Sequence, residues 1–177
     1  THSEKNIGTE SVFNIIIPEQ GVAVLNENVL SGYLSVGIHP WYINEQQVEQ
    51  QLVQLERLAK LPSVNVIGEC GLDRLHGPSF ELQQRIFEEH LFLAERLKKP
   101  LIIHCVRYFS ELISLKKLHR PSIPLIIHGF NNNMQIMQQL IRHGFYLSFG
   151  VALINEKSNA SKLLPLVPDK QLFLETS

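Results

Sequence analysis

Residues 100–128 read PLIIHCVRYFSELISLKKLHRPSIPLIIH. Two short apolar runs, Leu101–Cys105 and Leu125–His128, stand on either side of Phe109–Leu118, whose apolar residues recur with helical spacing. Both runs are almost entirely apolar rather than alternating, which is typical of strands that are covered on both faces of a parallel sheet. This pattern predicts a strand–helix–strand unit of an α/β protein.

The same alternation of strand-like and helix-like segments extends along most of the chain. Strands are expected at Val12–Ile17, Tyr33–Ile38, Val64–Glu69, Leu101–Cys105, Leu125–His128, Phe145–Phe149 and Leu172–Glu175. Helices are expected at Glu45–Leu61, Phe80–Lys98, Phe109–Leu118, Met134–His143 and, with weaker periodicity, Ala160–Leu166. Strands that alternate with helices in this way favour a (β/α) barrel or a doubly wound sheet. Between His2 and Tyr33 there is little helical periodicity, so the first crossover helices are expected to be shortened.

The composition excludes several classes of protein. With 177 residues, 44% of them hydrophobic, the chain can bury one sizeable core, so a single domain is expected. Lys and Arg number 16 against 17 Asp and Glu, so there is no basic field to coat nucleic acid, and phosphate must be bound by a few placed groups. No Gly-rich dinucleotide or P-loop motif is present. The apolar stretches are too short to span a bilayer, and Cys70 and Cys105 are expected to be buried thiols. The expected protein is cytoplasmic, with no membrane contact and no indicated protein partner.

Ionisable residues stand where the predicted strands end. The residues at these positions are His39, Glu69, His104, His128 and Glu175, and His2 lies just before the first run. In a (β/α) barrel the carboxyl ends of all strands meet at one face, so these side chains are expected to converge. A single histidine at a strand end is usually structural, but the repeated position favours a site. By contrast, His76, His90, His119 and His143 lie in loops or on helices and are expected to be surface or capping residues.

Histidine nitrogens together with a carboxylate are the ligands of Zn²⁺, Mn²⁺ and similar divalent ions. A carboxylate can use both oxygens, so Glu69 could bridge two ions. Two ions roughly 3.5–4 Å apart suit phosphoester hydrolysis, because one acidifies a bound water and both stabilise charge on phosphate oxygens. The spacing of the residues does not select the metal.

The motifs of this sequence resemble those of a known family, the TatD-type metal-dependent hydrolases. This family is a (β/α)8 TIM-type barrel branch of the amidohydrolase superfamily and has deoxyribonuclease members. The most specific motif is Val66-Ile67-Gly68-Glu69-Cys70-Gly71-Leu72-Asp73. The other matching segments are residues 37–40 (Gly-Ile-His-Pro), 100–105, 127–130, 144–148 and 172–176, and Gln84 with Phe87. The resemblance covers about residues 33–177.

The resemblance implies a metal-binding role for four residues. Glu69 corresponds to the carboxylate that two metals share. His104 and His128 correspond to the other ligands of the second metal. His2 resembles the end of the His-x-His motif that binds the first metal, and the first histidine of that motif would precede Thr1.

Three further residues match positions around the metals. His39 resembles a strand-end residue near the substrate phosphate. Arg107, just beyond His104, is expected to hold a phosphate, although it is displaced by one or two residues from the usual arginine. Asp73 is expected to orient the loop that follows Glu69.

Ser177 departs from the family pattern. At this position the family has an aspartate that binds the first metal and serves as general base, and a serine hydroxyl is a poor ligand and a poor base near neutral pH. Together with the interrupted His-x-His motif, this predicts that residues 1–177 form a single hydrolase barrel domain that is incomplete at both ends, with its first strand cut off.

The predicted function is that of a metal-dependent hydrolase that cleaves phosphodiester bonds in DNA with a metal-activated water. One or two divalent ions, Mg²⁺, Mn²⁺ or Zn²⁺, would be held by His2, Glu69, His104 and His128. His39 and Arg107 would position the phosphate, and the substrate would be DNA or a small phosphoester. Two alternatives stay open. One is a superfamily enzyme that acts on a small ester, amide or phosphoester, and the other is a non-catalytic relative.

Overall fold

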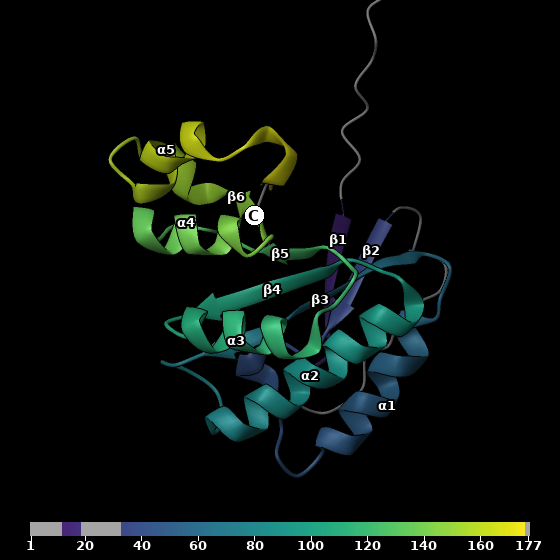
Figure 1. Ribbon diagram of the computed structural model, residues 1–177. Coiled ribbons are helices and arrows are strands. Elements are labelled where there is room, and N and C mark those ends of the chain that lie inside the picture. Colours follow the sequence, from purple (N-terminus) through teal and green to yellow (C-terminus); the bar gives the residue numbers. More distant parts are fainter. Residues whose placement is uncertain (1–11, 19–32, 176–177) are drawn as a thin grey trace, which may run out of the picture.

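The computed structural model describes residues 12–18 and 33–175 (Figure 1). His2, Ser177 and the first crossover, residues 19–32, lie outside the described residues. The expected strands are all present. They are β1 (Val12–Ile16), β2 (Tyr33–Gly37), β3 (Val64–Asp73), β4 (Leu101–Val106), β5 (Leu125–Ile127), β6 (Tyr146–Phe149) and β7 (Leu172–Leu174).

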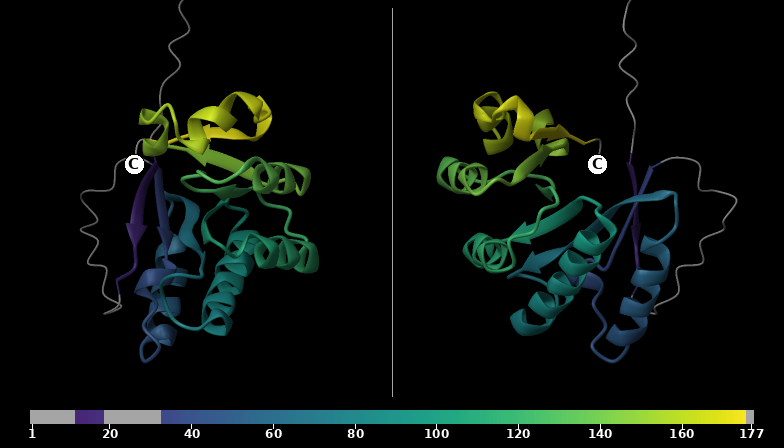
Figure 2. Two further views of the ribbon diagram at one scale, coloured as in Figure 1. Left: turned by 90° about the vertical axis from the view of Figure 1, so that its left-hand side faces the viewer. Right: turned by 45° about the vertical axis from the view of Figure 1, so that its right-hand side comes forward.

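The strands form one parallel sheet in the order β1-β2-β3-β4-β5-β6-β7. Strands that are neighbours in the sheet are also neighbours along the chain. In a doubly wound sheet the strand order would instead reverse at one point. The sheet curls into part of a barrel wall with the helices as its outer layer (Figure 2). The prediction of a (β/α) barrel is therefore confirmed.

The helices occupy the predicted segments between the strands. They are α1 (Val48–Ala59), α2 (Phe80–Leu97), α3 (Phe109–His119), α4 (Met134–Arg142) and α5 (Asn159–Leu163). The hydroxyl of Ser79 accepts from the backbone N–H of Leu82 and so caps α2, and Asn133 caps α4 in the same way. The weakly periodic segment forms α5 and then a 3-10 turn, Leu164–Leu166. Further 3-10 turns are η2 (Pro40–Tyr42), η3 (Val151–Ile154) and η5 (Asp169–Gln171).

The apolar runs of the central strands lie in the core, as the parallel pattern predicted, whereas the outer strands β1 and β7 expose Val12, Ile16, Phe173 and Leu174. Leu101 and Ile103 of β4 are fully buried, and so are Val64 and Ile67 of β3. Of the two free thiols, that of Cys70 is buried and that of Cys105 is partly buried. No helix in the described part of the chain is long and apolar enough to cross a membrane.

Strand β3 is longer than predicted and carries a bulge at its most specific motif. It was expected to end at Glu69 but continues to Asp73. Its register against β4 shifts between Ile67 and Cys70, so that β3 has an extra residue in the interval that contains Glu69. Beyond the bulge Gly71 has φ +147°, and a Cβ at this position would overlap the carbonyl oxygen of His104. Glycine is therefore required where β3 passes the site.

One histidine prediction is wrong. His90 on α2 was expected at the surface but is fully buried. Its Nε2 accepts from the backbone N–H of Ile38 at 2.9 Å, and its Nδ1 lies 2.7 Å from the carbonyl oxygen of Ile86, to which it donates. It lies on the same helix face as Ile86, so it belongs to the apolar face of α2. His76 and His143 follow the prediction, since His76 is exposed and His143 caps α4. His119, the last residue of α3, is partly buried, and its Nε2 lies 2.8 Å from Oε1 of Glu88.

Candidate metal centre

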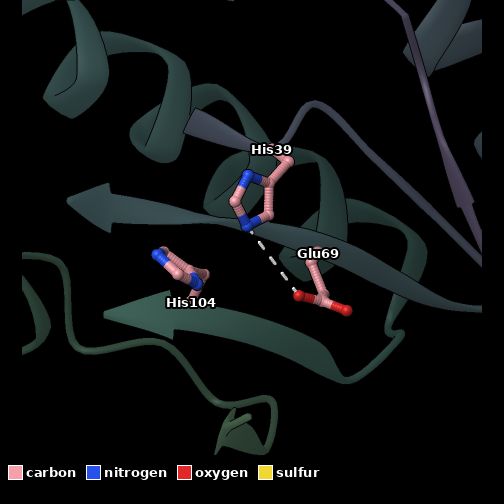
Figure 3. Close-up of side chains that lie close together, drawn as sticks. All are labelled: His39, Glu69 and His104. Atoms are coloured by element: carbon pink, nitrogen blue, oxygen red, sulfur yellow. Dashed lines mark ion pairs between the residues drawn. The ribbon is translucent and has the colours of Figure 1, made fainter. Parts of the chain in front are cut away.

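The ends of β2 and β4 and the bulge of β3 bring three side chains together. His39, Glu69 and His104 each offer one ligand atom, and these atoms all lie within 4.8 Å of one another (Figure 3). Nε2 of His39 is 4.0 Å from Oε2 of Glu69, and the ring centroids of His39 and His104 are 4.4 Å apart. Among the described residues this is the group of His, Cys, Asp and Glu side chains that is close enough to hold a metal ion.

Glu69 is held by a residue on β1. Its Oε1 accepts from Nδ2 of Asn14 at 2.8 Å, and its backbone N–H donates to Oδ1 of Asn14 at 3.2 Å. The hydroxyl of Ser35 donates to the same Oδ1 at 2.9 Å and so fixes the amide. Oε2 of Glu69 faces His39 and also His128, whose Nε2 is 3.7 Å away. This oxygen is therefore oriented toward the histidines with its lone pairs available.

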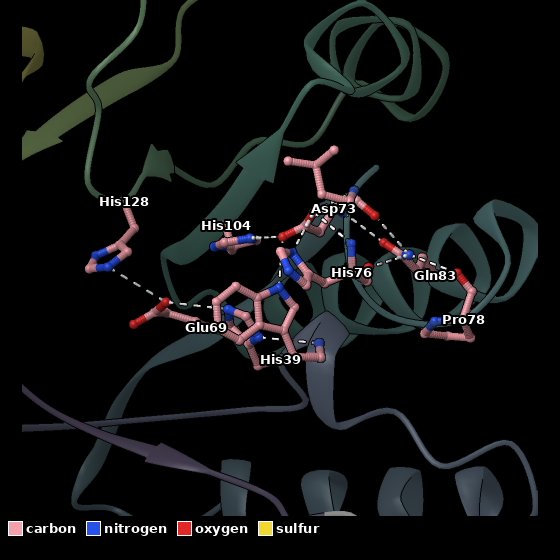
Figure 4. A network of polar contacts seen from close by, with 10 residues as sticks. His39, Glu69, Asp73, His76, Pro78, Gln83, His104 and His128 are labelled. Atoms are coloured by element: carbon pink, nitrogen blue, oxygen red, sulfur yellow. Dashed lines mark hydrogen bonds and ion pairs between the residues drawn. The ribbon is translucent and has the colours of Figure 1, made fainter. Parts of the chain in front are cut away.

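His104 is held by Asp73, which is completely buried. Nε2 of His104 lies 2.8 Å from Oδ2 of Asp73, and Nε1 of Trp41 donates to the same oxygen at 2.7 Å (Figure 4). Burial raises the pKa of Asp73, but the hydrogen bonds from Trp41, His104 and the backbone of Leu75 outweigh it and lower this pKa to about 2. Asp73 is thus a carboxylate that can only accept, so His104 carries a proton on Nε2. Its Nδ1 keeps the free lone pair.

His128 is held through its other ring nitrogen. Its Nδ1 lies 2.9 Å from Oε2 of Glu175, and the hydroxyl of Ser148 donates to the same oxygen at 2.6 Å. The hydrogen bond to Glu175 raises the pKa of His128, and burial acts against it. Burial raises the pKa of Glu175, but the hydrogen bonds from His128 and Ser148 outweigh it and lower this pKa below its ordinary value. Nδ1 of His128 therefore donates, and Nε2 faces Glu69.

His39 is neutral and turned as a donor. Burial, with the nearby His104, lowers its pKa to about 4. Its Nδ1 accepts from the backbone N–H of Trp41 at 3.3 Å, so the proton of the neutral ring is on Nε2, which faces Glu69. The expectation that His39 meets the substrate rather than the metal stays a prediction.

Arg107 lies at the rim of the site. It follows β4 directly, has a left-handed backbone with φ 59°, and its side chain is exposed. No ion pair or hydrogen bond ties the guanidinium to another residue of the described part of the chain. The guanidinium of Arg107 is thus exposed and not fixed in place, and its expected contact with a phosphate stays a prediction.

Several supporting residues are missing from the sequence prediction. Asn14 is a polar residue inside an apolar strand run, and this position could have indicated a role in the site. Gln83 is buried, and its Oε1 accepts from the backbone N–H of Asp73 at 2.7 Å while its Nε2 donates to the carbonyl oxygens of Asp73, His76 and Pro78. The neighbouring Gln84, which was part of the resemblance, hydrogen-bonds to Glu88 instead. Gln83 lies on the same helix face as Phe87, so its burial was readable from the helical period.

Most of the chain resembles proteins of one known family. A family model described as TatD related DNase matches residues 17–177. An uncharacterized metal-dependent hydrolase of Buchnera aphidicola is 34% identical over 154 residues, which are 85% of this chain and 56% of that protein. The 3'-5' ssDNA/RNA exonuclease TatD of Escherichia coli is 31% identical over 150 residues, which are 82% of this chain and 57% of that protein. The chain thus spans little more than half the length of these relatives.

A solved structure shows the same fold. The crystal structure of YJJV, a TatD homolog from Escherichia coli, superposes with a TM-score of 0.73 at 28% identity. The match covers 92% of this chain and 66% of that one.

Proposed function

The chain belongs to the TatD-related DNase family, and from this premise we propose that its protein is a divalent-metal-dependent hydrolase that cleaves phosphodiester bonds in DNA. One observation carries the proposal. Glu69 and His104 belong to the group that is close enough to hold a metal ion, and Nε2 of His128 lies 3.7 Å from Oε2 of Glu69. Each of these three side chains is held on its other side by a polar partner. Such outer partners are typical of metal ligands, since they fix the ring or carboxylate before the ion arrives.

The donor set fits a divalent cation. It consists of Oε2 of Glu69, Nδ1 of His104 and Nε2 of His128, two neutral imidazole nitrogens and one carboxylate, which suits Zn²⁺ or Mn²⁺ and accommodates Mg²⁺ less readily. When bound, one or two such ions would acidify a water and stabilise negative charge on phosphate oxygens. His2 belongs to the same proposal as a ligand of the first metal, on the strength of the sequence motif alone.

The other groups of the site bind and orient the substrate. The neutral His39 would donate its Nε2–H to a phosphate oxygen. Because burial lowers its pKa to about 4, the ring does not take up a second proton in the neutral range. Arg107 supplies a positive charge at the rim. We assign these functions to one catalytic domain, residues 1–177, and the cytoplasmic location stays a prediction.

The test is hydrolysis of single-stranded DNA by the protein that carries this chain. We expect activity with Mn²⁺ or Mg²⁺ that is lost on chelation. Glu69→Gln, which keeps the shape and the contact with Asn14, should lose both Mn²⁺ binding, measured by calorimetry, and hydrolysis. Glu45→Gln is the matched control, because Glu45 is exposed and outside the site.

Three other outcomes would overturn the proposal. Equal hydrolysis by wild type and Glu69→Gln would place the activity elsewhere. Turnover of small esters or phosphoesters without turnover of DNA would favour the alternative of a superfamily enzyme that acts on small substrates. A folded protein that binds no metal and hydrolyses nothing would favour a non-catalytic relative.

A further inference from the structure

Two aromatic side chains are exposed beside the metal centre. The turn η2 follows His39 directly, and its Trp41 and Tyr42 are 45% and 39% exposed. The residues that flank this pair, Pro40 and Ile43, are buried, so the turn itself is anchored in the core. Burial of a large aromatic side chain contributes much to stability, so two exposed ones beside a candidate site indicate a surface that binds a ligand.

The indole of Trp41 is held rigidly. Its Nε1 donates to Oδ2 of Asp73 at 2.7 Å, which satisfies its only donor. The ring stands edge-on to His39 and His104, with centroids 5.1 and 5.7 Å away and interplanar angles of 85° and 77°. The ring of His76 also packs against the indole, with centroids 5.0 Å apart and an interplanar angle of 51°. The exposed remainder of the indole is an apolar surface in a fixed orientation. A ligand that stacks on it meets no entropy cost from ordering the side chain.

Two cations lie at the same rim. Arg74 and Arg107 follow β3 and β4, whose ends are joined by the hydrogen bond from the backbone N–H of Arg74 to the carbonyl oxygen of Val106. Both side chains are exposed, and Arg74 lies 5.5 Å from the ring centroid of Tyr108. Within the described ranges, neither arginine forms an ion pair with an acidic side chain. Both positive charges are therefore available to a polyanion. The net charge of the chain is -1, so the chain as a whole does not attract a polyanion, and such local charges matter more.

We propose that Trp41 is a stacking platform for a nucleobase of single-stranded nucleic acid, with Arg74 and Arg107 on the adjoining phosphates. This inference rests on the proposed function and adds the residues at the rim of the same site that would bind the bases and phosphates of its substrate. An aromatic face with placed cations is the usual means of binding single strands, because every base has a π-face and every linkage a charge. A base inside a duplex is stacked between its neighbours and cannot use such a platform, so the site selects unpaired bases.

The sequence provides a direct probe of this contact. Trp41 is the single tryptophan among residues 1–177, so the part of the intrinsic fluorescence that Trp41→Phe removes reports on this ring. We expect quenching when a single-stranded oligonucleotide is added in the presence of a chelator, which prevents hydrolysis. An abasic oligonucleotide of equal length and charge should bind more weakly and leave the fluorescence unchanged. Equal quenching by both, or none by either, would overturn the proposal.

Variants separate stacking from charge and from folding. By anisotropy with a labelled single strand, Trp41→Ala should weaken binding roughly 5- to 150-fold, whereas Trp41→Phe, which keeps an aromatic face, should retain most of the affinity. Tyr33→Ala is the matched control, since Tyr33 is a similarly exposed aromatic residue at the opposite end of β2. Arg74→Gln and Arg107→Gln should each lower the salt dependence of log K by about 0.7. Unchanged affinity in a folded Trp41→Ala protein would refute the platform.

The platform and the proposed hydrolysis fail in different ways. Binding is measured without metal, so quenching in a protein that does not cleave DNA would support the platform and count against the hydrolase. Metal-dependent cleavage with unchanged single-strand affinity in Trp41→Ala would keep the hydrolase and refute the platform.

Discussion

Oδ2 of Asp73 lies 2.8 Å from Nε2 of His104, and the same oxygen accepts the indole N–H of Trp41. One buried carboxylate therefore orients a candidate metal ligand and the neighbouring aromatic ring. Its other oxygen, Oδ1, accepts from the backbone N–H groups of Leu75 and His76 and fixes the loop that follows β3. The network in Figure 4 joins the metal site to its rim through this residue.

Asp73→Asn should weaken metal binding without unfolding the protein. The amide group is neutral and has one acceptor oxygen in place of two, so it cannot hold the Nε2–H of His104 and also the neighbouring donors as the carboxylate does. We expect the affinity for Mn²⁺ to fall about 10- to 100-fold in calorimetry. Asp169→Asn, at an exposed carboxylate in η5, should leave the affinity unchanged. An unaltered affinity in Asp73→Asn would show that His104 needs no such partner.

Glu175→Gln should lower the pKa of His128 in the metal-free protein. The hydrogen bond to Glu175 is the largest influence that raises this pKa, and a neutral amide replaces a charge-assisted bond with a weaker one. An NMR titration of the His128 ring measures the change, with Glu156→Gln, at an exposed position, as the control. If the pKa of His128 stays where it is in the wild type, the two side chains do not form this bond in solution.

The stability of the metal-free protein should depend on His90 in acid. Burial lowers the pKa of His90 from 6.5 to about 4. Between these pH values the unfolded chain binds a proton that the folded chain does not, so the free energy of unfolding falls as the pH drops. The contribution is fully present above pH 6.5 and decreases by about 3 kcal/mol by pH 4.

His90→Gln isolates this contribution. The amide oxygen of glutamine can accept from the backbone N–H of Ile38 and does not titrate. Urea unfolding at several pH values between 7 and 4 should show a shallower loss of stability in the variant. His39 shifts in the same direction but is present in both proteins, so the difference between them belongs to His90. Identical slopes would mean that His90 is not buried as a neutral ring.

Gly71→Ala should destabilise the fold more than Gly129→Ala. Both residues have positive φ, but a Cβ on Gly71 would overlap the carbonyl of His104, whereas a Cβ on Gly129 would meet Glu175 at an ordinary 3.6 Å. Overpacking at Gly71 should cost about 2 kcal/mol or more, and the substitution at Gly129 about 1 kcal/mol. Urea denaturation measures both values, and an equal cost would contradict the close approach of β3 and β4.

The positions of the strands and helices could be predicted because they follow from neighbours along the chain. Runs such as Leu101–Cys105 have the all-apolar pattern of buried parallel strands, and the parallel arrangement then gathers the residues at strand ends at one face. His39, Glu69 and His104 were placed together by this rule, and the structure brings them within ligand distance. The prediction that His90 lies at the surface was wrong, although its spacing of four residues from Ile86 indicated that it belongs to the apolar face of α2.

The identity of the outer partners was decided only by the tertiary structure. Asn14 meets Glu69 across 55 residues of sequence, and Asp73 meets His104 across 31. These pairings depend on the register of the sheet and on the bulge in β3, which no local period encodes. The sequence by itself predicted that His39, Glu69 and His104 would meet at one face of the barrel, but not which side chains hold them. The register determined which nitrogen of His104 and of His128 carries the proton, because only the packed strands bring a carboxylate to one side of each ring.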